Sequence, residues 1–297
     1  MTEAQNTPNP LPARIEAARL DAGLYLVATP IGAARDITLR ALDVLNSADV
    51  LAAEDTRTLR HLMEIHGIPL RGRRILATHD HNEDRQAEVL AAAAGDGKSI
   101  AYCSDAGTPL VADPGFRLAR EAARRGVRIH AVPGPSAALA ALSVAGLPSD
   151  RFLFAGFAPQ PLAARRSWLA DVTAVDATSI IFDSPRRVKQ TLAILCEIDP
   201  NRSTVLCREL TKKFEETLRG TPGEIGERLP EGGLKGEIVL VIDRPSVSLP
   251  GEDEIDAALA ALLDGNSVRD AAAAVAERFG ISRRDAYQRA LTFERKS

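Results

Sequence analysis

The sequence predicts an α/β protein of two domains, followed by a small helical module. Short apolar runs alternate with helical patterns twice along the chain, the order that places helices on the faces of a sheet. The turn-rich segment 146–150 separates the two series, and the composition changes again after Pro250-Gly251. The expected parts are a flexible tail (1–22), an N-terminal α/β domain (23–146), a second α/β domain (151–245) and a helical module (252–297).

The first 22 residues do not resemble a targeting signal. They carry Pro8, Pro10 and Pro12 among polar residues and lack the apolar core of a signal peptide. The sequence also has no run of about 18 apolar residues, the length that crosses a bilayer. We therefore expect a loose tail and no membrane segment.

Five short apolar runs predict the sheet of the N-terminal domain. The expected strands are 24–28, 49–53, 74–78, 99–103 and 127–132. Thr38 is a plausible N-cap for the first helix, because Leu39, Leu42 and Leu45 follow it at helical spacing. Helical stretches separate the strands, so the sheet should be mostly parallel and covered on both faces.

The second domain repeats the pattern with four apolar runs. The expected strands are 152–157, 178–182, 205–207 and 237–242. Helices are expected around Trp168 and from Pro185 to about Cys196.

Three helical patterns follow Pro250-Gly251. Ser267 and Ser282 each precede a carboxylate by three residues, as in a capping box, and Gly280 lies between the last two helices. This arrangement is typical of a helix-turn-helix, although any small helical bundle has the same pattern.

Charge is unevenly distributed along a chain whose formal net charge is −3. Residues 267–297 hold seven basic side chains against four acidic ones. A nucleic-acid partner would therefore have to be held by a local basic patch, for which Arg283 and Arg284 are candidates. A merely solvated helical face would have the same composition.

Cys103, Cys196 and Cys207 are an odd number of cysteines without metal-ligand spacing. This pattern favours reduced core thiols in the cytoplasm, and no metal site is expected.

The segment Ser104–Gly115 is the strongest signal for a ligand site. It follows a predicted strand directly and combines two glycines with two prolines, which makes a rigid, irregular loop where α/β proteins bind ligands. A second loop, Val132–Ala137, follows the next strand. There, Gly134 permits a close backbone approach, and Ser136 is positioned to cap the next helix. The first strand is followed by no GxGxxG fingerprint, and the sequence has no P-loop.

Seven segments of the chain form a recognisable combination when they are taken in order: Leu24–Gly32, Ala53–Arg57, Ser104–Gly115, Val132–Ser136, Phe182–Arg187, Arg208–Lys213 and Lys235–Glu237. Together they resemble the tetrapyrrole-methylase-like superfamily, in its branch of small-subunit ribosomal RNA (cytidine-2'-O)-methyltransferases. The positions that depart from the branch pattern are Ala33 (Asn expected), Asp80 (Glu), Asp183 (Glu) and Arg186 (His). Because Arg186 replaces His, no histidine base is expected in that loop.

This resemblance implies a homodimer with S-adenosylmethionine in a cleft between the two α/β domains. The implied cofactor contacts are Ile31, Asp105, Val111, Ser136, Ala137 and Phe182, with Gly107, Thr108, Pro109 and Gly134 shaping the walls. Carboxylate and carbonyl oxygens suit the sulfonium charge of this methyl donor.

Transfer to a ribose 2'-hydroxyl, a weak nucleophile, would benefit from a general base. Candidates are Glu54, Asp55 and Glu209. Lys212, Arg57 and Arg187 are candidates for orienting the adjacent phosphate. Each also has a structural interpretation, such as a surface pair of Arg57 with Asp55.

Two other functions remain open at this stage. A tetrapyrrole methyltransferase of the same fold would need a wide apolar trough, which the aromatic content of 4% supports weakly. A non-catalytic ribosome-assembly factor would use the fold as an RNA clamp and need not bind S-adenosylmethionine.

Overall fold

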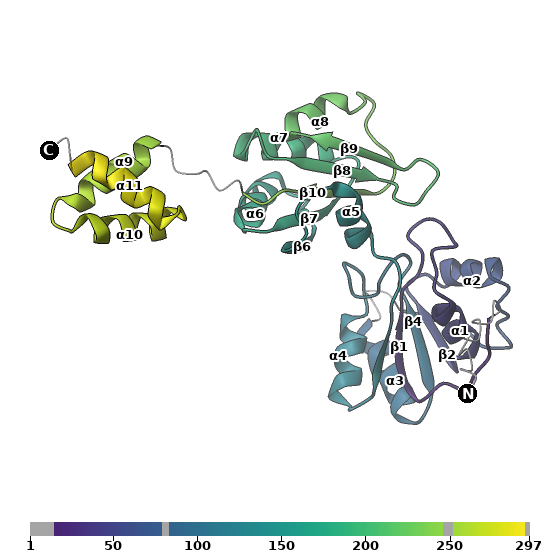
Figure 1. Cartoon of the computed structure of the whole chain (residues 1–297). Helices are drawn as coiled ribbons and strands as arrows, with labels where there is room; N and C mark the ends of the chain where they lie inside the picture. The colour runs from purple at the N-terminus through teal and green to yellow at the C-terminus, as the bar shows by residue number, and fades with distance from the viewer. Residues whose placement is uncertain (1–14, 79–82, 246–251, 295–297) are drawn as a thin grey trace, which may run out of the picture. The chain divides into compact units, whose positions relative to one another are not determined.

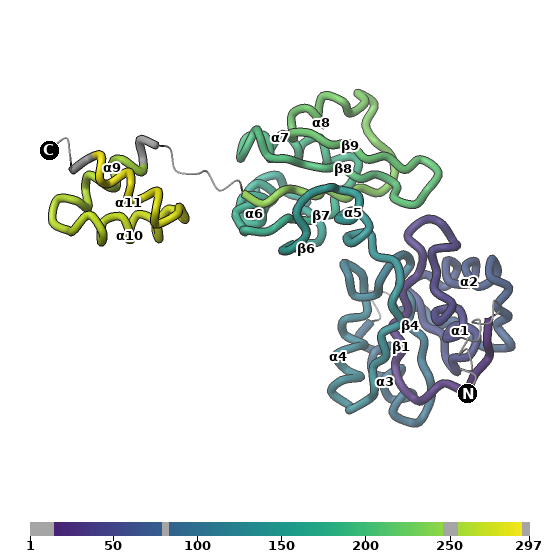
Figure 2. Tube along the Cα trace, in the orientation of Figure 1, coloured from purple at the N-terminus to yellow at the C-terminus, as the bar shows by residue number. Residues whose placement is uncertain are grey.

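The computed structural model describes residues 15–78, 83–245 and 252–294. The chain divides into two compact units, Met1–Pro245 and Ser246–Ser297, which we describe separately (Figures 1 and 2). The first unit holds two sheets with their helices, and the described part of the second holds three helices.

The first sheet is parallel throughout, with the strand order β3-β2-β4-β1-β5. Its strands are β1 (Gly23–Val27), β2 (Val50–Ala53), β3 (Ile75–Ala77), β4 (Ser99–Cys103) and β5 (Ile129–Val132). The central β4 is buried along its whole length, which explains its continuous apolar sequence. The predicted parallel sheet is confirmed.

Helices cover both faces of this sheet (Figure 1). They are α1 (Leu39–Ser47), α2 (Thr56–Ile65), α3 (Glu83–Gly95) and α4 (Phe116–Arg124). Leu51 packs into the core beneath α1 and α2, and its neighbour Ala52 packs into the core beneath α3 and α4. This alternation is the period of a strand buried on both sides. Thr38 caps α1 as predicted, because its hydroxyl accepts a 3.1 Å hydrogen bond from the Ala41 amide.

The expected N-terminal tail includes residues 1–14, which lie outside the described residues. Residues 15–22 are described, and part of this segment lies against α1. The Glu16 amide donates to Asp43 at 2.7 Å, and Ile15 and Leu20 pack on the adjacent core. The prediction of a flexible tail is therefore wrong for this part of residues 15–22.

The second sheet has the order β6-β7-β10-β8-β9 and is mostly antiparallel. Its strands are β6 (Phe152–Phe157), β7 (Thr178–Asp183), β8 (Thr204–Arg208), β9 (Glu216–Gly220) and β10 (Ile238–Ile242). Only the pair β6·β7 is parallel. One face is covered by α6 (Leu162–Ala174), α7 (Val188–Ile198) and α8 (Pro222–Arg228).

The helix α5 (Ala137–Ala145) packs on the other face of the second sheet, although it follows β5 of the first. Ala141 and Leu142 contact Val205 and Val241 in one core cluster. The predicted division at 146 assigned this helix to the N-terminal domain. By its packing α5 belongs with the second sheet, so the chain changes layer at the Val132–Ser136 loop.

The sequence prediction missed β9 and α8. The residues of β9, ETLRG, are largely polar and include only one buried side chain, Leu218. The start of α8 did carry a signal, since Thr221 and Glu224 form a capping box.

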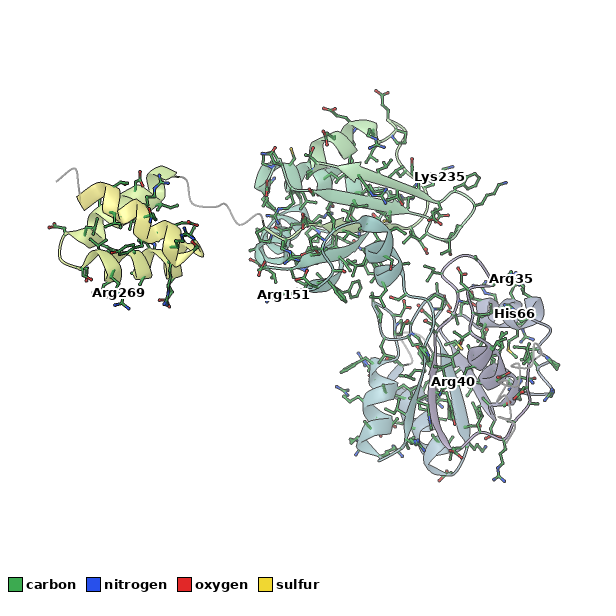
Figure 3. All side chains as sticks on the ribbon, in the orientation of Figure 1. Arg35, Arg40, His66, Arg151, Lys235 and Arg269 are labelled. Atoms are coloured by element: carbon green, nitrogen blue, oxygen red, sulfur yellow. The ribbon has the colours of Figure 1, made fainter. Side chains whose placement is uncertain are left out.

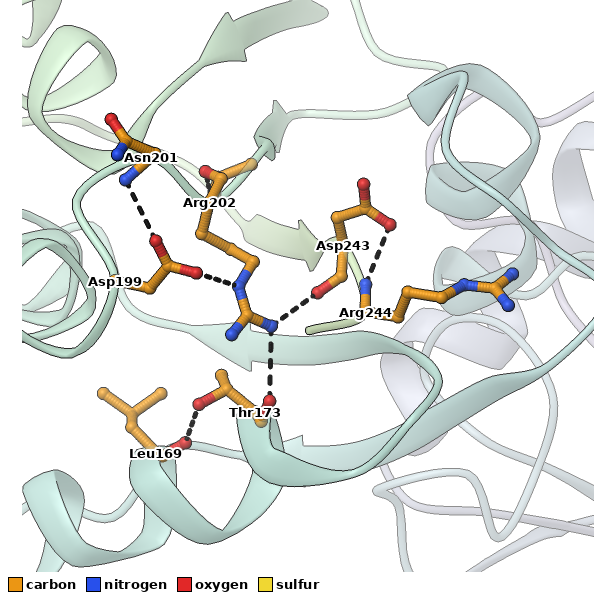
Figure 4. Close-up of polar contacts among 8 residues, drawn as sticks. Leu169, Thr173, Asp199, Asn201, Arg202, Asp243 and Arg244 are labelled. Carbon is orange, nitrogen blue, oxygen red and sulfur yellow. Dashed lines mark hydrogen bonds and ion pairs between the residues drawn. The ribbon is translucent and has the colours of Figure 1, made fainter. Parts of the chain in front are cut away.

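A partly buried arginine connects helix ends to the second sheet (Figure 4). Arg202 forms an ion pair with Asp199 at 2.9 Å, just after α7. Its Nη1 donates to the carbonyl of Thr173 in α6 at 3.2 Å and to that of Asp243, just after β10, at 3.0 Å. This contact network fixes the end of β10, whose opposite end borders the cavity described below.

The second unit consists of α9 (Glu252–Leu263), α10 (Val268–Phe279) and α11 (Arg283–Glu294) around Leu259, Val275 and Ala290. Ser267 and Ser282 accept hydrogen bonds from the amides of Asp270 and Asp285 at 3.1 and 3.0 Å, as predicted. Gly280 ends α10 at φ 64°, a conformation that favours glycine.

The three cysteines are free thiols. Cys103 and Cys207 are buried, and burial raises their pKa values to about 12 and about 11. Cys196 is only partly buried, contrary to the expectation of a core position.

Candidate functional site

Three loops at the carboxyl ends of the first sheet's strands are bonded to one another. Thr29, after β1, exchanges two 2.9 Å backbone hydrogen bonds with Gly107, after β4. The Ser104 hydroxyl donates to the Gly107 carbonyl at 3.0 Å, and the Thr108 hydroxyl donates to the carbonyl of Pro135 at 2.9 Å. The loop predicted from glycines and prolines is therefore held rigidly at the end of the sheet.

These loops form one wall of a cavity of about 470 Å³, within the range of small-molecule sites. The opposite wall comes from the second sheet, at the ends of β6 and β7 and the start of β10. The predicted site residues that line the cavity are Ile31, Glu54, Asp105, Gly107, Thr108, Val111, Ser136, Ala137 and Phe182.

Two predicted wall residues lie elsewhere. Pro109 is buried and does not line the cavity, and Gly134 lines a neighbouring groove with Pro135 and Leu139. A Cβ on Gly134 would lie 2.9 Å from that of Ala28, so the absence of a side chain permits a close approach to the end of β1. Ser136 precedes α5 but makes no side-chain cap. The predicted cap is wrong, and its side chain lies at the cavity instead.

Several lining residues were not predicted. They are Ala106, Ala112, Asp113, Phe157, Asp183, Ser184, Pro185, Gly236, Glu237, Ile238 and Val239. Asp113 lies in the loop that the sequence singled out, so its carboxylate was a recognisable candidate. Phe157 and Ile238 are ordinary strand residues in the sequence, and only the packing of two sheets brings them to the cavity.

The cavity wall is acidic. Its charged lining residues are Glu54, Asp105, Asp113, Asp183 and Glu237, and none of the described lining residues is basic. Burial, and then the neighbouring charge of Asp105, raise the pKa of Asp113 to about 6. Asp105 accepts a 2.8 Å hydrogen bond from the Asp55 amide, which orients its carboxylate. This environment favours a cation and disfavours a phosphate.

Asp55 is engaged by an arginine. It caps α2 through the Arg57 amide at 2.8 Å, and the Arg57 guanidinium contacts its carboxylate at 2.6 Å. Hydrogen bonds from Arg57 lower the pKa of Asp55 to about 2. A carboxylate of such low pKa is a weak base, and the structure supports the surface-pair interpretation of these two residues.

Glu209 and Lys212 belong to an ion-pair cluster beside the cavity. The Lys212 ammonium lies 3.0 Å from a carboxylate oxygen of Glu209 and 2.9 Å from one of Glu237. The amide of Glu237 and the Lys212 side chain hold the pKa of Glu209 below its usual value. Partial burial lowers the pKa of Lys212, but its hydrogen bonds to Glu237 and Glu209 and the charges of these carboxylates together outweigh burial, so the pKa is raised.

The remaining predicted cation of the cleft, Arg187, is also paired. Its Nε lies 3.3 Å from Asp183, a buried carboxylate that also accepts hydrogen bonds from the Ser184 amide at 2.7 Å and the Thr191 hydroxyl at 2.5 Å. Arg57, Lys212 and Arg187 are thus all neutralised by carboxylates. Arg283 and Arg284 lie exposed on α11 in the other unit.

Comparison with known proteins matches both units. A family model of tetrapyrrole (corrin/porphyrin) methylases matches residues 23–226, and one of the RsmI C-terminal HTH domain matches residues 250–294. The ribosomal RNA small subunit methyltransferase I of Mesorhizobium japonicum is 44% identical over 279 residues, covering 93% of this chain and 94% of that protein. Its counterpart in Escherichia coli O157:H7 is 42% identical and covers 90% of this chain and 94% of its own.

Solved structures share the fold at low sequence identity. Diphthine synthase is 18% identical with a TM-score of 0.55, covering 74% of this chain and 89% of its own. Uroporphyrin-III-C-methyltransferase from Thermus thermophilus is 22% identical with a TM-score of 0.51, and the match covers 74% of this chain and 94% of that protein. Among the described residues, no helix is long and apolar enough to cross a membrane.

Proposed function

The chain belongs to the tetrapyrrole methylase family and, within it, to the ribosomal RNA small subunit methyltransferases I, and from this premise we propose its reaction. The proposed reaction is transfer of the methyl group of S-adenosylmethionine to the 2'-hydroxyl of a cytidine in 16S ribosomal RNA. The observation that carries the proposal is the acidic cavity at the carboxyl ends of the parallel strands.

The cavity suits the methyl donor in size and charge. S-adenosylmethionine would supply an electrophilic methyl group on a positively charged sulfur. The carboxylate of Asp105 would lie near that charge, and Ile31, Ala137 and Phe182 offer apolar surface. The bonded loops hold these groups in place, and positioning is the main requirement of an in-line displacement.

The acceptor hydroxyl needs a base at the cavity wall, which five carboxylates line. Asp183 and Glu237 form ion pairs with Arg187 and Lys212, and Asp105 is assigned to the charge of the methyl donor. The candidates are therefore Glu54 and Asp113. The pKa of Asp113, about 6, lies close to working pH, where a general base is most effective. We assign proton acceptance to Asp113, with Glu54 as the alternative, in place of Asp55 and Glu209.

The second unit would dock the RNA. Arg283 and Arg284 are exposed on the last helix, in the segment that matches an HTH domain. Arg269 is exposed on α10 and is marked in Figure 3. The RNA partner, as naked 16S RNA or as an assembled small subunit, would be bound through phosphates at these cations.

We also infer that the protein is a cytoplasmic homodimer. Exposed apolar side chains that an interface would cover include Ile129 on the edge strand β5, which is 37% exposed, and Leu139 on α5, which is 52% exposed. Light scattering at micromolar concentration should give twice the chain mass of 31.7 kDa. A mass equal to one chain would contradict the dimer.

The direct test of the reaction uses labelled S-adenosylmethionine and undermethylated small subunits. Label should appear on a single cytidine, and mass spectrometry of nuclease fragments should place it on the ribose. A parallel incubation with a tetrapyrrole acceptor tests for a tetrapyrrole methyltransferase. Calorimetry of cofactor binding tests for a non-catalytic assembly factor, which need not bind S-adenosylmethionine. Label on the tetrapyrrole alone, or no cofactor binding, would contradict the proposal.

A further inference from the structure

Two loops beside the cavity present an aromatic ring and two lysines to solvent. One loop, 209–215, joins β8 to β9, and the other, 235–237, leads into β10; together we call them the rim loops. Phe214 is 64% exposed, the largest value among the large hydrophobic side chains of the described residues. The Lys213 ammonium lies 5.5 Å from the centre of its ring. Lys235 is exposed on the second rim loop (Figure 3).

The rim loops are held in a defined conformation. Glu209 and Thr211 have φ angles of 51° and 63°, which are costly for residues with side chains. The amide of Glu209 donates to the Glu237 carbonyl at 3.0 Å, and the amide of Glu237 donates back to the Glu209 carboxylate at 3.0 Å. Lys212 joins the same two carboxylates. Because these contacts already order the loop, binding of a ligand at the exposed ring should cost little conformational entropy of the backbone.

The rim loops continue into the cavity wall. Gly236 and Glu237 line the cavity, and a Cβ on Gly236 would lie 2.5 Å from the Glu209 side chain. Phe214 follows Lys212, whose ammonium reaches Glu237, by two residues. The loop that carries Phe214 is therefore joined to the cavity wall through the contact of Lys212 with Glu237.

The distribution of charge favours phosphate binding at the rim loops and disfavours it in the cavity. The cavity wall is acidic, and Arg57, Arg187 and Lys212 are paired with carboxylates. Lys213 and Lys235 form no ion pair within the described part of the chain. The carboxylates that follow Phe214 are engaged locally, because Glu215 accepts the Thr211 amide at 2.7 Å and Glu216 pairs with Arg208 at 3.0 Å.

We propose that the rim loops bind single-stranded RNA, with Phe214 stacking on an unpaired base and Lys213 and Lys235 contacting phosphates of the same strand. Single-stranded RNA is typically bound by aromatic stacking combined with nearby cations. This inference rests on the proposed function, since it assigns to an RNA substrate the surface next to the reaction cavity.

Fluorescence anisotropy with a labelled single-stranded oligocytidylate tests the binding directly. Phe214→Ala should weaken RNA affinity by about tenfold or more, and Phe214→Trp should retain it. The logarithm of RNA affinity should fall linearly with the logarithm of salt concentration. Replacing Lys213 and Lys235 with Ala should reduce the steepness of this line by about 1.4, the contribution of two phosphate contacts on single-stranded RNA. Phe214→Ala should leave that slope unchanged. All variants should bind S-adenosylmethionine as the wild type does.

Matched controls are Phe152→Ala and Lys98→Ala. Phe152 is 45% exposed at the end of β6 far from the cavity, and Lys98 is exposed at the amino end of β4. Neither variant should change RNA binding.

Wild-type RNA affinity in Phe214→Ala, or wild-type protein that does not bind the oligonucleotide, would overturn the inference. A lower mass of Phe214→Ala in light scattering would also overturn it, because the ring would then belong to a subunit interface. Wild-type protein that binds RNA at Phe214 but methylates no subunits would contradict only the proposed function.

Discussion

The cavity of the first unit and the last two helices of the second differ in the charge that they present. Five carboxylates line the cavity without a basic side chain among its described lining residues. Residues 267–297 carry seven basic side chains against four acidic ones. A cationic methyl donor and a polyanionic RNA cannot both be attracted by one surface, so separation of the two charges suits a protein that binds both.

The positive charge of the second unit is itself restricted. The stretch 252–266, which includes α9, has five acidic residues and no basic one, so the module as a whole is not basic. Arg289 on α11 is paired with Asp256 of α9, and Arg283 and Arg284 are exposed. The excess of basic residues is therefore confined to residues 267–297, and an RNA contact should be local.

The largest effect that we predict is on the cavity, from Gly107→Val. Gly107 has a φ of 82°, and a Cβ there would lie 3.3 Å from Ile31 Cγ2. The side chain would add strain and occupy cofactor space, so S-adenosylmethionine affinity should fall by about 100-fold or more in calorimetry. Gly97→Val is the control for strain alone, since Gly97 has a φ of 94° and nothing within 4 Å of its Cβ position. Equal cofactor affinity in the two variants would show that the cavity is not the cofactor site.

Asp113→Asn should lower kcat by about 100-fold, the contribution expected of a general base. The pKa of Asp113 is raised to about 6, so its carboxylate accepts a proton only above that pH. The wild-type rate should accordingly rise with pH through about 6, and the variant should lose this rise. Cofactor affinity, measured alongside, should change far less than kcat. An unchanged pH profile in Asp113→Asn and a lost one in Glu54→Gln would transfer the role to Glu54.

Deleting residues 252–297 should weaken binding to small subunits by about ten- to 100-fold and flatten its salt dependence. The cavity lies wholly within the first unit, so S-adenosylmethionine binding should persist. Filter binding at several salt concentrations and calorimetry measure the two properties. A truncated protein that methylates subunits at the wild-type rate and salt slope would place RNA recognition entirely in the first unit.

The smallest effect should come from replacing Arg283 and Arg284 with Ala. Loss of two phosphate contacts should weaken small-subunit binding roughly fivefold and reduce the salt slope by about 1 to 2. The double change of Arg85 and Lys98 to Ala removes the same charge from exposed positions of the first unit and is the control. If both double variants lost the same affinity for small subunits, the effect would come from net charge in general and not from RNA contacts on α11.

Local sequence determined the elements and the main ligand loop. The β4 strand was predictable because its five residues are all buried, and the caps at Thr38 and Ser267 were predictable because each hydroxyl bonds an amide three residues away. The Ser104–Gly115 loop was predictable because glycine and proline restrict backbone conformations locally. These features depend on contacts between near neighbours in sequence, which periodicity and turn chemistry report.

Only the tertiary structure decided which charges and walls meet. It packed α5 on the second sheet, placed Phe157 and Glu237 in the cavity wall, and paired Lys212 with two carboxylates. It also buried Asp113, which raises the pKa of that carboxyl group, whereas the low pKa of Asp55 comes from Arg57, two residues away. Burial depends on residues distant in sequence that folding brings together, so local patterns could indicate the Asp55–Arg57 pair but not the chemistry of Asp113.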